Sequence, residues 1–358
     1  MCRPGCRSAT YTDGALDAIP HDALTGRRCL VTGGLGFIGS NLALDLARRG
    51  AQVTVLDARV PRHGANPFNL VDDGAQEADP RIQVIEADLG TSWGEGARDD
   101  LRAAAAAADF VFNLAGQVSH VDSMNDPLFD LSVNTTSQFA FLELLRAVNP
   151  HTTVVYTSTR QIFGKPKYLP VDEEHPVNPV DVNGITKYAA EQLHHLYHDV
   201  YGLRASTVRL TNVYGPRQRL TDDLQGFLPI FLRRALAGDT ISVFGEGDQQ
   251  RDCLYVDDVV ECLELAALTS DAAGQIFNVG NDERLSLAEI AQSVVDVVGR
   301  GRVEHVPWPP DRDAIDIGSY FGDSSKAKRL LGWEPRTPFA EGMARTVAFY
   351  RDRMAWYS

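Results

Sequence analysis

Residues 29–40 read CLVTGGLGFIGS, and this stretch decides the fold. Its first residues are apolar, as in a buried strand, and residues 40–50, SNLALDLARRG, have apolar positions at helical spacing. Between them Gly33, Gly36 and Gly39 form a GxxGxxG turn. Glycines at this spacing permit a tight strand-to-helix turn and a close approach of the backbone to a pyrophosphate. The stretch therefore predicts a dinucleotide site at a helix N-terminus, which includes Phe37 and Ile38.

Further segments rich in Val, Ile and Leu alternate with helical or loop segments. They cover residues 52–57, 81–89, 109–116, 152–159 and 203–215. Buried strands that alternate with helices favour a parallel sheet covered on both faces. The predicted fold class is α/β, a doubly wound parallel sheet of Rossmann type with a smaller C-terminal α/β domain that binds the substrate.

The domain organisation follows from where this pattern starts and stops. Residues 1–26 are expected to form a flexible tail, and residues 27–210 the dinucleotide-binding domain. After Pro216 the pattern changes, and residues 226–238 predict an amphipathic helix. Residues 211–251 and 281–358 are assigned to the second domain, whereas residues 252–280 are expected to be interleaved with the first.

Composition excludes several classes of protein. Among 358 residues, 34 Lys and Arg stand against 48 Asp and Glu, and a net charge of −14 argues against a general nucleic-acid binder. The five cysteines have no regular spacing, which argues against a disulfide framework or a zinc site. No apolar run reaches the length of a membrane span, and the first 26 residues lack the apolar block of a signal peptide. We therefore expect a cytoplasmic protein without a metal or a membrane partner.

Asp57 ends the strand that follows the glycine-rich helix. A carboxylate at this position accepts hydrogen bonds from the ribose hydroxyls of a dinucleotide and repels a 2′-phosphate. Arg59 and Arg62 follow it and would partly offset that repulsion. The pattern favours NAD over NADP as the cofactor.

Several motifs occur in the order typical of one family: TGGLGFIG, the pair Asp88 and Leu89, NLAG at 113–116, Asn134, and RLTNVYGP at 209–216. Together they resemble the extended short-chain dehydrogenase/reductase family over about residues 27–340. This family includes nucleotide-sugar 4-epimerases, 4,6-dehydratases and decarboxylases, and the chain is most similar to UDP-glucose 4-epimerase-like members. The resemblance implies NAD as cofactor and a nucleotide diphosphate sugar as substrate.

The resemblance also implies roles for particular residues and helices. Asp88 and Leu89 would flank the adenine, and Leu114 and Ala115 would line the cofactor groove. The long helices near residues 127–148 and 184–201 would pair across a two-fold axis in a homodimer.

The catalytic positions depart from the family pattern at one residue. The family uses a Ser or Thr after the fifth strand, then a Tyr and a Lys in a YxxxK motif. Thr159 and Lys187 match, but Asn183 stands where the tyrosine is expected. An amide cannot act as a base. A desolvated Lys187, or His120 in QVSHVDS, could take the proton instead; the acidic loop at 171–175 is a third candidate.

The substrate side carries the remaining candidates. Asn212 and Arg251 match family positions that contact the substrate's phosphates, and Arg312 is a possible second guanidinium for the diphosphate. The resemblance implies that retaining 4,6-dehydratases need an Asp and a Glu where this chain has Arg160 and Gln161, and that inverting ones, which also lack the tyrosine, need an Asp at the position of Arg160. Gln161 is expected to contact substrate.

The missing carboxylates favour a 4-epimerase, because elimination of water needs an acid and a base. Two alternatives remain open. One is a dehydratase, decarboxylase or oxidoreductase with a relocated base. The other is a catalytically inactive protein that binds NAD and a sugar nucleotide.

Overall fold

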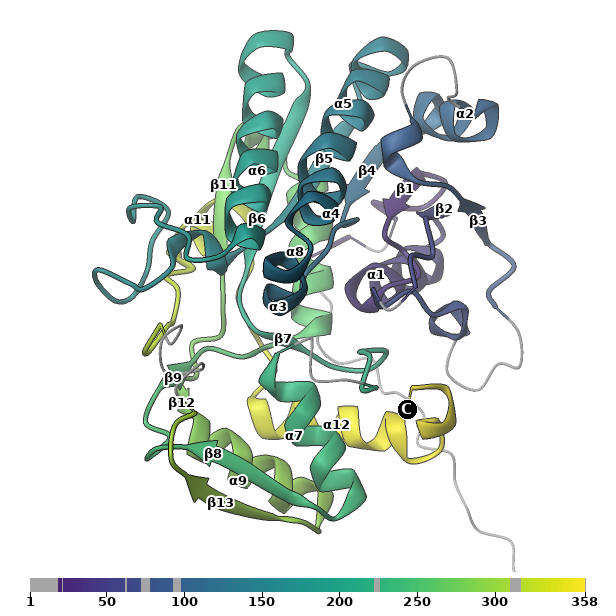
Figure 1. The fold of residues 1–358 in the computed structure, drawn as a ribbon. Helices are drawn as coiled ribbons and strands as arrows, with labels where there is room; N and C mark the ends of the chain where they lie inside the picture. The colour runs from purple at the N-terminus through teal and green to yellow at the C-terminus, as the bar shows by residue number, and fades with distance from the viewer. Residues whose placement is uncertain are drawn as a thin grey trace, which may run out of the picture.

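The computed structural model describes residues 19–20, 22–61, 63–71, 78–92, 98–221, 226–309 and 317–357. The larger part of the fold is a sheet with helices on both faces, and a smaller C-terminal lobe lies below it in Figure 1. In this part of the chain no helix combines the length and the apolar character needed to cross a membrane.

The sheet is parallel and has seven strands in the order β11-β6-β5-β4-β1-β2-β3. The order reverses beside β1, which pairs with both β2 and β4, and this arrangement confirms the predicted doubly wound fold. The strands are β1 (Arg28–Thr32), β2 (Gln52–Asp57), β3 (Ile82–Glu86), β4 (Phe110–Asn113), β5 (Thr153–Thr159), β6 (Arg204–Leu210) and β11 (Ile276–Val279).

The single strand predicted over residues 203–215 is wrong in one respect. The chain leaves the sheet after Leu210, and β7 (Val213–Tyr214) pairs with β10 (Leu254–Tyr255) in a separate two-stranded ladder. Just before β7, the carbonyl oxygen of Asn212 accepts a hydrogen bond from the backbone N–H of Leu254 at 3.0 Å.

Helices cover the sheet on both sides. α1 (Phe37–Arg48) and α8 (Val256–Leu268) pack on one face, and α2 (Asp99–Ala107), α5 (Ser137–Val148) and α6 (Val182–Tyr201) pack on the other (Figure 1). α11 (Ser325–Leu331) packs beside β11. The helix predicted near residues 127–148 is divided into α4 (Pro127–Leu131), a π-helical turn (Ser132–Thr136) and α5, and α3 (His120–Asn125) precedes it.

The flexible tail predicted over residues 1–26 does not hold for its last residues. Ile19 and Leu24 are buried in the same core as α1 and α8. Burial of these two apolar side chains stabilises the end of the tail against the core, although the residues around them are mostly polar. Residues 1–18 lie outside the described part of the chain.

The C-terminal lobe has a core of its own. β8 (Thr240–Phe244) pairs in parallel with β13 (Arg302–Val306), and β9 (Gln250–Arg251) pairs with β12 (Leu285–Ser286). α7 (Phe227–Ala237), α9 (Leu287–Val298) and α12 (Phe339–Arg351) surround this core. α7 corresponds to the amphipathic helix predicted over residues 226–238. The remaining short 3₁₀ turns are Pro67–Leu70, Leu89–Thr91, Arg160–Phe163, Ser270–Ala272 and Met354–Trp356.

Candidate active site

A cavity of about 460 Å³ lies where the carboxyl ends of the strands meet the first turn of α7. In a doubly wound sheet this edge is the usual ligand site. The predicted cofactor residues line the cavity: Gly33, Gly36, Phe37, Ile38, Gly39, Asp57, Asp88, Leu89, Leu114, Ala115 and Lys187. The candidates Thr159, Asn183, His120, Gln161 and Asn212 also line it. The structure therefore brings these residues to one cavity.

The glycine-rich turn fits a pyrophosphate. Gly33 has a φ of +69°, and a Cβ atom there would lie 3.0 Å from the Cα atom of Ala115. A Cβ atom on Gly39 would lie 2.4 Å from the carbonyl oxygen of Gly33. Because side chains are excluded at both positions, the backbone remains exposed to a ligand, and the free N–H groups at the start of α1 face the same space.

Asp57 is fixed at the end of β2. Its two carboxylate oxygens accept hydrogen bonds from the backbone N–H groups of Leu35 at 3.1 Å and Arg59 at 2.8 Å. Burial raises the pKa of Asp57, and these two N–H groups partly oppose that rise. The Arg59 side chain pairs with Glu86 at 3.2 Å, and Arg62 lies outside the described residues. This arrangement suits the ribose of NAD.

Lys187 is buried on α6, and its ammonium group lies directly beneath Gly116, whose Cβ atom would come within 2.4 Å of Nζ. Burial lowers the pKa of Lys187 to about 8, although the charge of Asp130 opposes this shift. Nζ also lies 5.6 Å from the centre of the Tyr156 ring. Among the described residues the ammonium makes no hydrogen bond or ion pair, so its N–H groups are available to a ligand in the cavity.

Thr159 ends β5, and its Oγ1 atom accepts a hydrogen bond from the backbone N–H of Gln161 at 3.2 Å. Arg160 lies between them in sequence and also lines the cavity, with its guanidinium 5.1 Å from the centre of the Tyr320 ring. A guanidinium and an amide thus occupy the two positions at which the resemblance leads us to expect carboxylates in a retaining 4,6-dehydratase.

Asn183 is buried at the start of α6, and hydrogen bonds hold its side-chain amide in place. Its Nδ2 atom donates to the carbonyl oxygen of Gln117 at 2.8 Å, to Gln117 Oε1 at 3.2 Å and to Asp130 Oδ2 at 3.2 Å. Asp130 is fully buried and also accepts hydrogen bonds from Thr186 and Asn134. Asn183 is therefore part of a polar network that connects α6 to α4 and to the loop after β4.

His120 occupies the space between the two catalytic segments. Its Nδ1 atom contacts the carboxylate of Asp181, and its Nε2 atom contacts the side-chain amide of Gln161. Sequence reasoning missed Asp181, Gln117 and Asp130. Of these only Asp181 carries a local signal, because an Asp before a helix is a common N-cap and its Oδ1 atom accepts from the N–H of Gly184 at 2.7 Å.

The three residues predicted to contact the phosphates of the substrate differ in where the structure places them. Asn212 lines the cavity, and its Oδ1 atom is buried without a hydrogen-bond partner in the described residues. Arg251 is not among the lining residues: in β9 its Nη1 atom donates to the carbonyl oxygens of Gln250 at 2.8 Å and Gly318 at 2.7 Å. Arg312 lies outside the described residues.

The acidic loop at 171–175 is also not among the residues that line the cavity. Its Glu173 accepts from the backbone of Asn278 at 2.7 Å, and its His175 accepts from the backbone of Lys167 at 2.8 Å. Within the described ranges, no group of three or more His, Cys, Asp and Glu side chains could hold a metal ion.

Residues 29–280 match the NAD dependent epimerase/dehydratase family. The chain belongs to this family. NAD is its cofactor, and the glycine turn and Asp57 described above fit that dinucleotide.

Two relatives of similar identity carry different names. The chain is 32% identical over 329 residues to the UDP-glucose 4-epimerase of Mycolicibacterium smegmatis, covering 91% of this chain and 99% of that protein. It is also 32% identical over 341 residues to a dTDP-glucose 4,6-dehydratase of Streptomyces niveus, covering 92% and 94%.

Solved structures divide in the same way. The UDP-glucose 4-epimerase of Thermotoga maritima with UDP-glucose is 27% identical, with a TM-score of 0.78 and coverage of 91% of this chain and 99% of that one. A dTDP-glucose 4,6-dehydratase of Streptomyces venezuelae with NAD bound is 27% identical, with a TM-score of 0.78 and coverage of 92% and 99%. Sequence identity therefore does not distinguish epimerisation from dehydration. The side chains in the cavity have to distinguish them.

Proposed function

We propose that this protein is an NAD-dependent nucleotide-sugar epimerase that acts at C4 of the sugar. The observation that carries the proposal is the pair Arg160 and Gln161 in a cavity that retains the cofactor residues. Elimination of water from a sugar needs a proton donor and a proton acceptor beside the reacting carbons. A guanidinium stays protonated and an amide does not titrate, so neither can serve. Epimerisation at C4 does not need that pair.

The residues have distinct roles in this reaction. Gly33, Gly36 and Gly39 leave the backbone open to the pyrophosphate, and Asp57 accepts from the ribose hydroxyls. NAD held by these residues would supply the hydride acceptor for C4 and the hydride donor for its return. Lys187, whose Nζ atom lies next to Gly116, donates hydrogen bonds to the cofactor and the sugar.

On the sugar side, Thr159 donates from its hydroxyl to the sugar oxygen that becomes a carbonyl. Asn212 and Gln161, which line the same cavity, contact the sugar nucleotide. Arg251 and Arg312 remain candidates for the diphosphate; the first would have to give up its backbone partners.

The test is a survey of UDP, dTDP, GDP, CDP and ADP sugars with the purified protein and NAD. The expected result is a pair of C4 epimers of unchanged mass, resolved by chromatography and NMR. Loss of water or of carbon dioxide would show instead a dehydratase or decarboxylase with a relocated base. The matched control is Gly39→Val, which should bind no NAD and leave every sugar unchanged.

Asn183 favours one other function, an inactive protein that binds NAD and a sugar nucleotide. Calorimetry would then detect binding of both ligands, while no sugar of the survey would be converted and bound NAD would never be reduced. In that case Asn183→Tyr should produce activity, whereas an enzyme with a base elsewhere should lose activity or change little.

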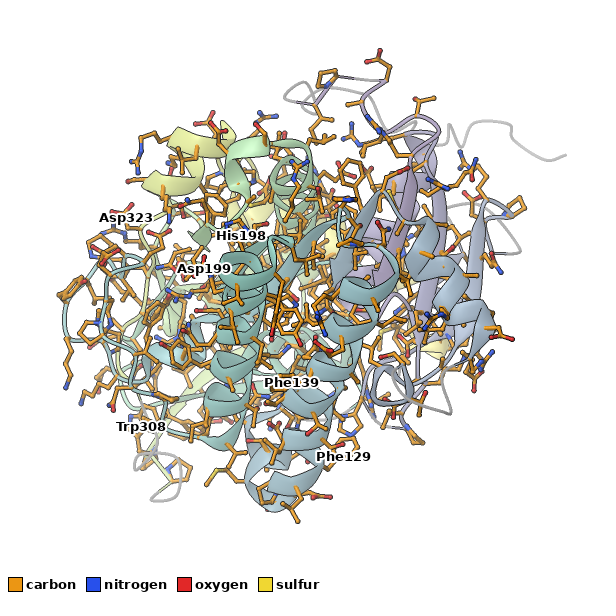
Figure 2. The ribbon with its side chains drawn as sticks, turned by 90° about the horizontal axis from the view of Figure 1, so that it is seen from above. Phe129, Phe139, His198, Asp199, Trp308 and Asp323 are labelled. Carbon is orange, nitrogen blue, oxygen red and sulfur yellow. The ribbon has the colours of Figure 1, made fainter. Side chains whose placement is uncertain are left out.

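We also propose a homodimer in the cytoplasm. The outer surfaces of α3 to α6 expose a group of apolar side chains, and Figure 2 looks onto these helices with Phe139 labelled on α5. The group comprises Val121, Met124, Leu128, Leu131, Phe139, Ile185, Leu196, Val200 and Tyr201. Exposed apolar surface of this kind marks an interaction site. Light scattering after size exclusion tests for a dimer, and cell fractionation tests the location.

A further inference from the structure

A 4-epimerase must remove the proton of a hydroxyl group as the hydride leaves, and Asn183 cannot take it. Whatever takes it has to lie in the cavity, near Thr159 and Lys187. His120 meets this requirement from a different element, the start of α3.

The imidazole of His120 connects the two catalytic segments. Nδ1 contacts the carboxylate of Asp181, two residues before Asn183, and Nε2 contacts the amide of Gln161, two residues after Thr159. The His120 side chain is 43% exposed in the open cavity, whereas that of Asp181 is only 12% exposed. The ring is thus held at both nitrogens while a large part of the side chain stays accessible.

The surroundings of Asp181 keep it ionised. Burial raises its pKa, but the hydrogen bond and charge of His120 and the N–H of Gly184 outweigh burial and hold the pKa below its ordinary value. An ionised carboxylate only accepts hydrogen bonds, so Nδ1 of His120 carries the proton. Nε2 then presents a lone pair towards the cavity, where the Gln161 amide donates to it.

We propose that His120 is the proton carrier that replaces the absent tyrosine, with Asp181 as its positioning residue. This inference rests on the proposed function. Nε2 accepts the hydroxyl proton as the O–H bond breaks and a carbonyl forms, and the C4 hydride would pass to the NAD that this family uses. When the hydride returns to the other face, the same proton goes back to the oxygen, so protons and electrons balance over the cycle. The Asp181 carboxylate stabilises the imidazolium between the two steps.

Other charged groups surround this pair without forming the same contact. Asp181 is the carboxylate in contact with His120, Arg160 acts on Asp181 at longer range, and Lys187 lines the same cavity. In the free protein the Gln161 amide donates to His120 Nε2, and in the complex the substrate hydroxyl would replace the amide as the donor.

The experiment compares His120→Ala, Asp181→Asn and the exposed control His151→Ala in the epimerase assay. His120→Ala should lower kcat by about 10²- to 10⁴-fold with little change in KM, and added imidazole should restore part of the loss. Asp181→Asn should lower kcat by about tenfold or more with little change in KM, because the imidazolium that forms during the reaction loses its counter-charge. Asn remains a good N-cap, so α6 should stay intact.

Two results would overturn the proposal: His120→Ala with the kcat of His151→Ala, or a kcat loss in His120→Ala that imidazole does not restore. In the first case Lys187 becomes the base. If the wild-type protein converts no sugar nucleotide, the proposed function fails, and the tautomer of the His120 ring, measured by ¹⁵N NMR, then decides the pairing by itself. A His120 ring that carries its proton on Nε2 rather than on Nδ1 would contradict it.

Discussion

Replacing Asn183 by alanine should destabilise the protein strongly, although no charge is removed. Asn183 is 1% exposed, and its amide donates to two acceptors of Gln117 and to the buried carboxylate of Asp130. A hydrogen bond to a charged group contributes about 1.5–3 kcal/mol, and a neutral one contributes about 1 kcal/mol. The change leaves these acceptors buried with fewer donors. We expect the free energy of unfolding to fall by about 3 kcal/mol.

The assay is equilibrium unfolding in urea without added NAD, followed by fluorescence and circular dichroism together. The matched control is Asn125→Ala on the exposed end of α3, where the loss should stay within about 0.5 kcal/mol. An Asn183→Ala protein as stable as this control would refute the reasoning. The hydrogen bonds of Asn183 would then contribute little to the stability of the fold.

Three further predictions concern cofactor, charge and assembly. Asp57→Ala should weaken NAD binding by about tenfold or more in a fluorescence titration, because the ribose hydroxyls lose their acceptor; unchanged affinity would place the ribose elsewhere. Because the pKa of Lys187 is about 8 in the folded protein against 10.5 normally, the unfolded chain binds more protons between these values. Stability should therefore rise with pH from about 8 to about 10.5, by about 3 kcal/mol relative to Lys187→Met, and parallel pH curves for the two proteins would contradict this. Ile185→Arg, at a position 56% exposed on α6, should give a monomer in light scattering, whereas a dimer would exclude this face.

The sequence predicted the parts of the site that depend on local chemistry. The strand, glycine turn and helix around Gly33 are adjacent in the chain, and Asp57 ends the next strand, so spacing alone predicted a shared site. Thr159 and Lys187 also reached the cavity as expected. The glycine turn and Asp57 follow from the local pattern of the chain, whereas Thr159 and Lys187 were predicted from the resemblance to the family.

What the sequence could not predict are contacts between distant segments. His120 and Asp181 are 61 positions apart, and Asn183 and Gln117 are 66 apart, so no periodicity connects them. The prediction for Arg251 depended on the direction of one side chain in a two-residue strand, and that side chain turns to the backbone.

The same hydrogen bonds connect Asn183 to the proposed proton carrier. Its amide holds the backbone of Gln117, and its backbone N–H donates to Ser123 Oγ at 3.2 Å. Ser123 in turn donates to the carbonyl oxygen of His120 at 2.8 Å. The residue that replaces the tyrosine therefore fixes both the loop that leads into α3 and the helix turn that carries the imidazole.

This connection predicts strong coupling between Asn183 and His120 in catalysis. Asn183→Ala keeps the backbone donor to Ser123 but removes the side-chain hydrogen bonds to Gln117, so it should lower kcat by loosening the loop that leads to His120. The double variant with His120→Ala should have the kcat of His120→Ala alone. The measurement is a double-mutant cycle on kcat under conditions where all four proteins are folded. Additive losses would mean that Asn183 acts on the substrate by itself. With full coupling, the loss of the phenol and the use of the imidazole are one structural change, since a tyrosine at 183 would keep the backbone donor to Ser123 but lose the side-chain hydrogen bonds that hold Gln117, at the start of the loop that leads to His120.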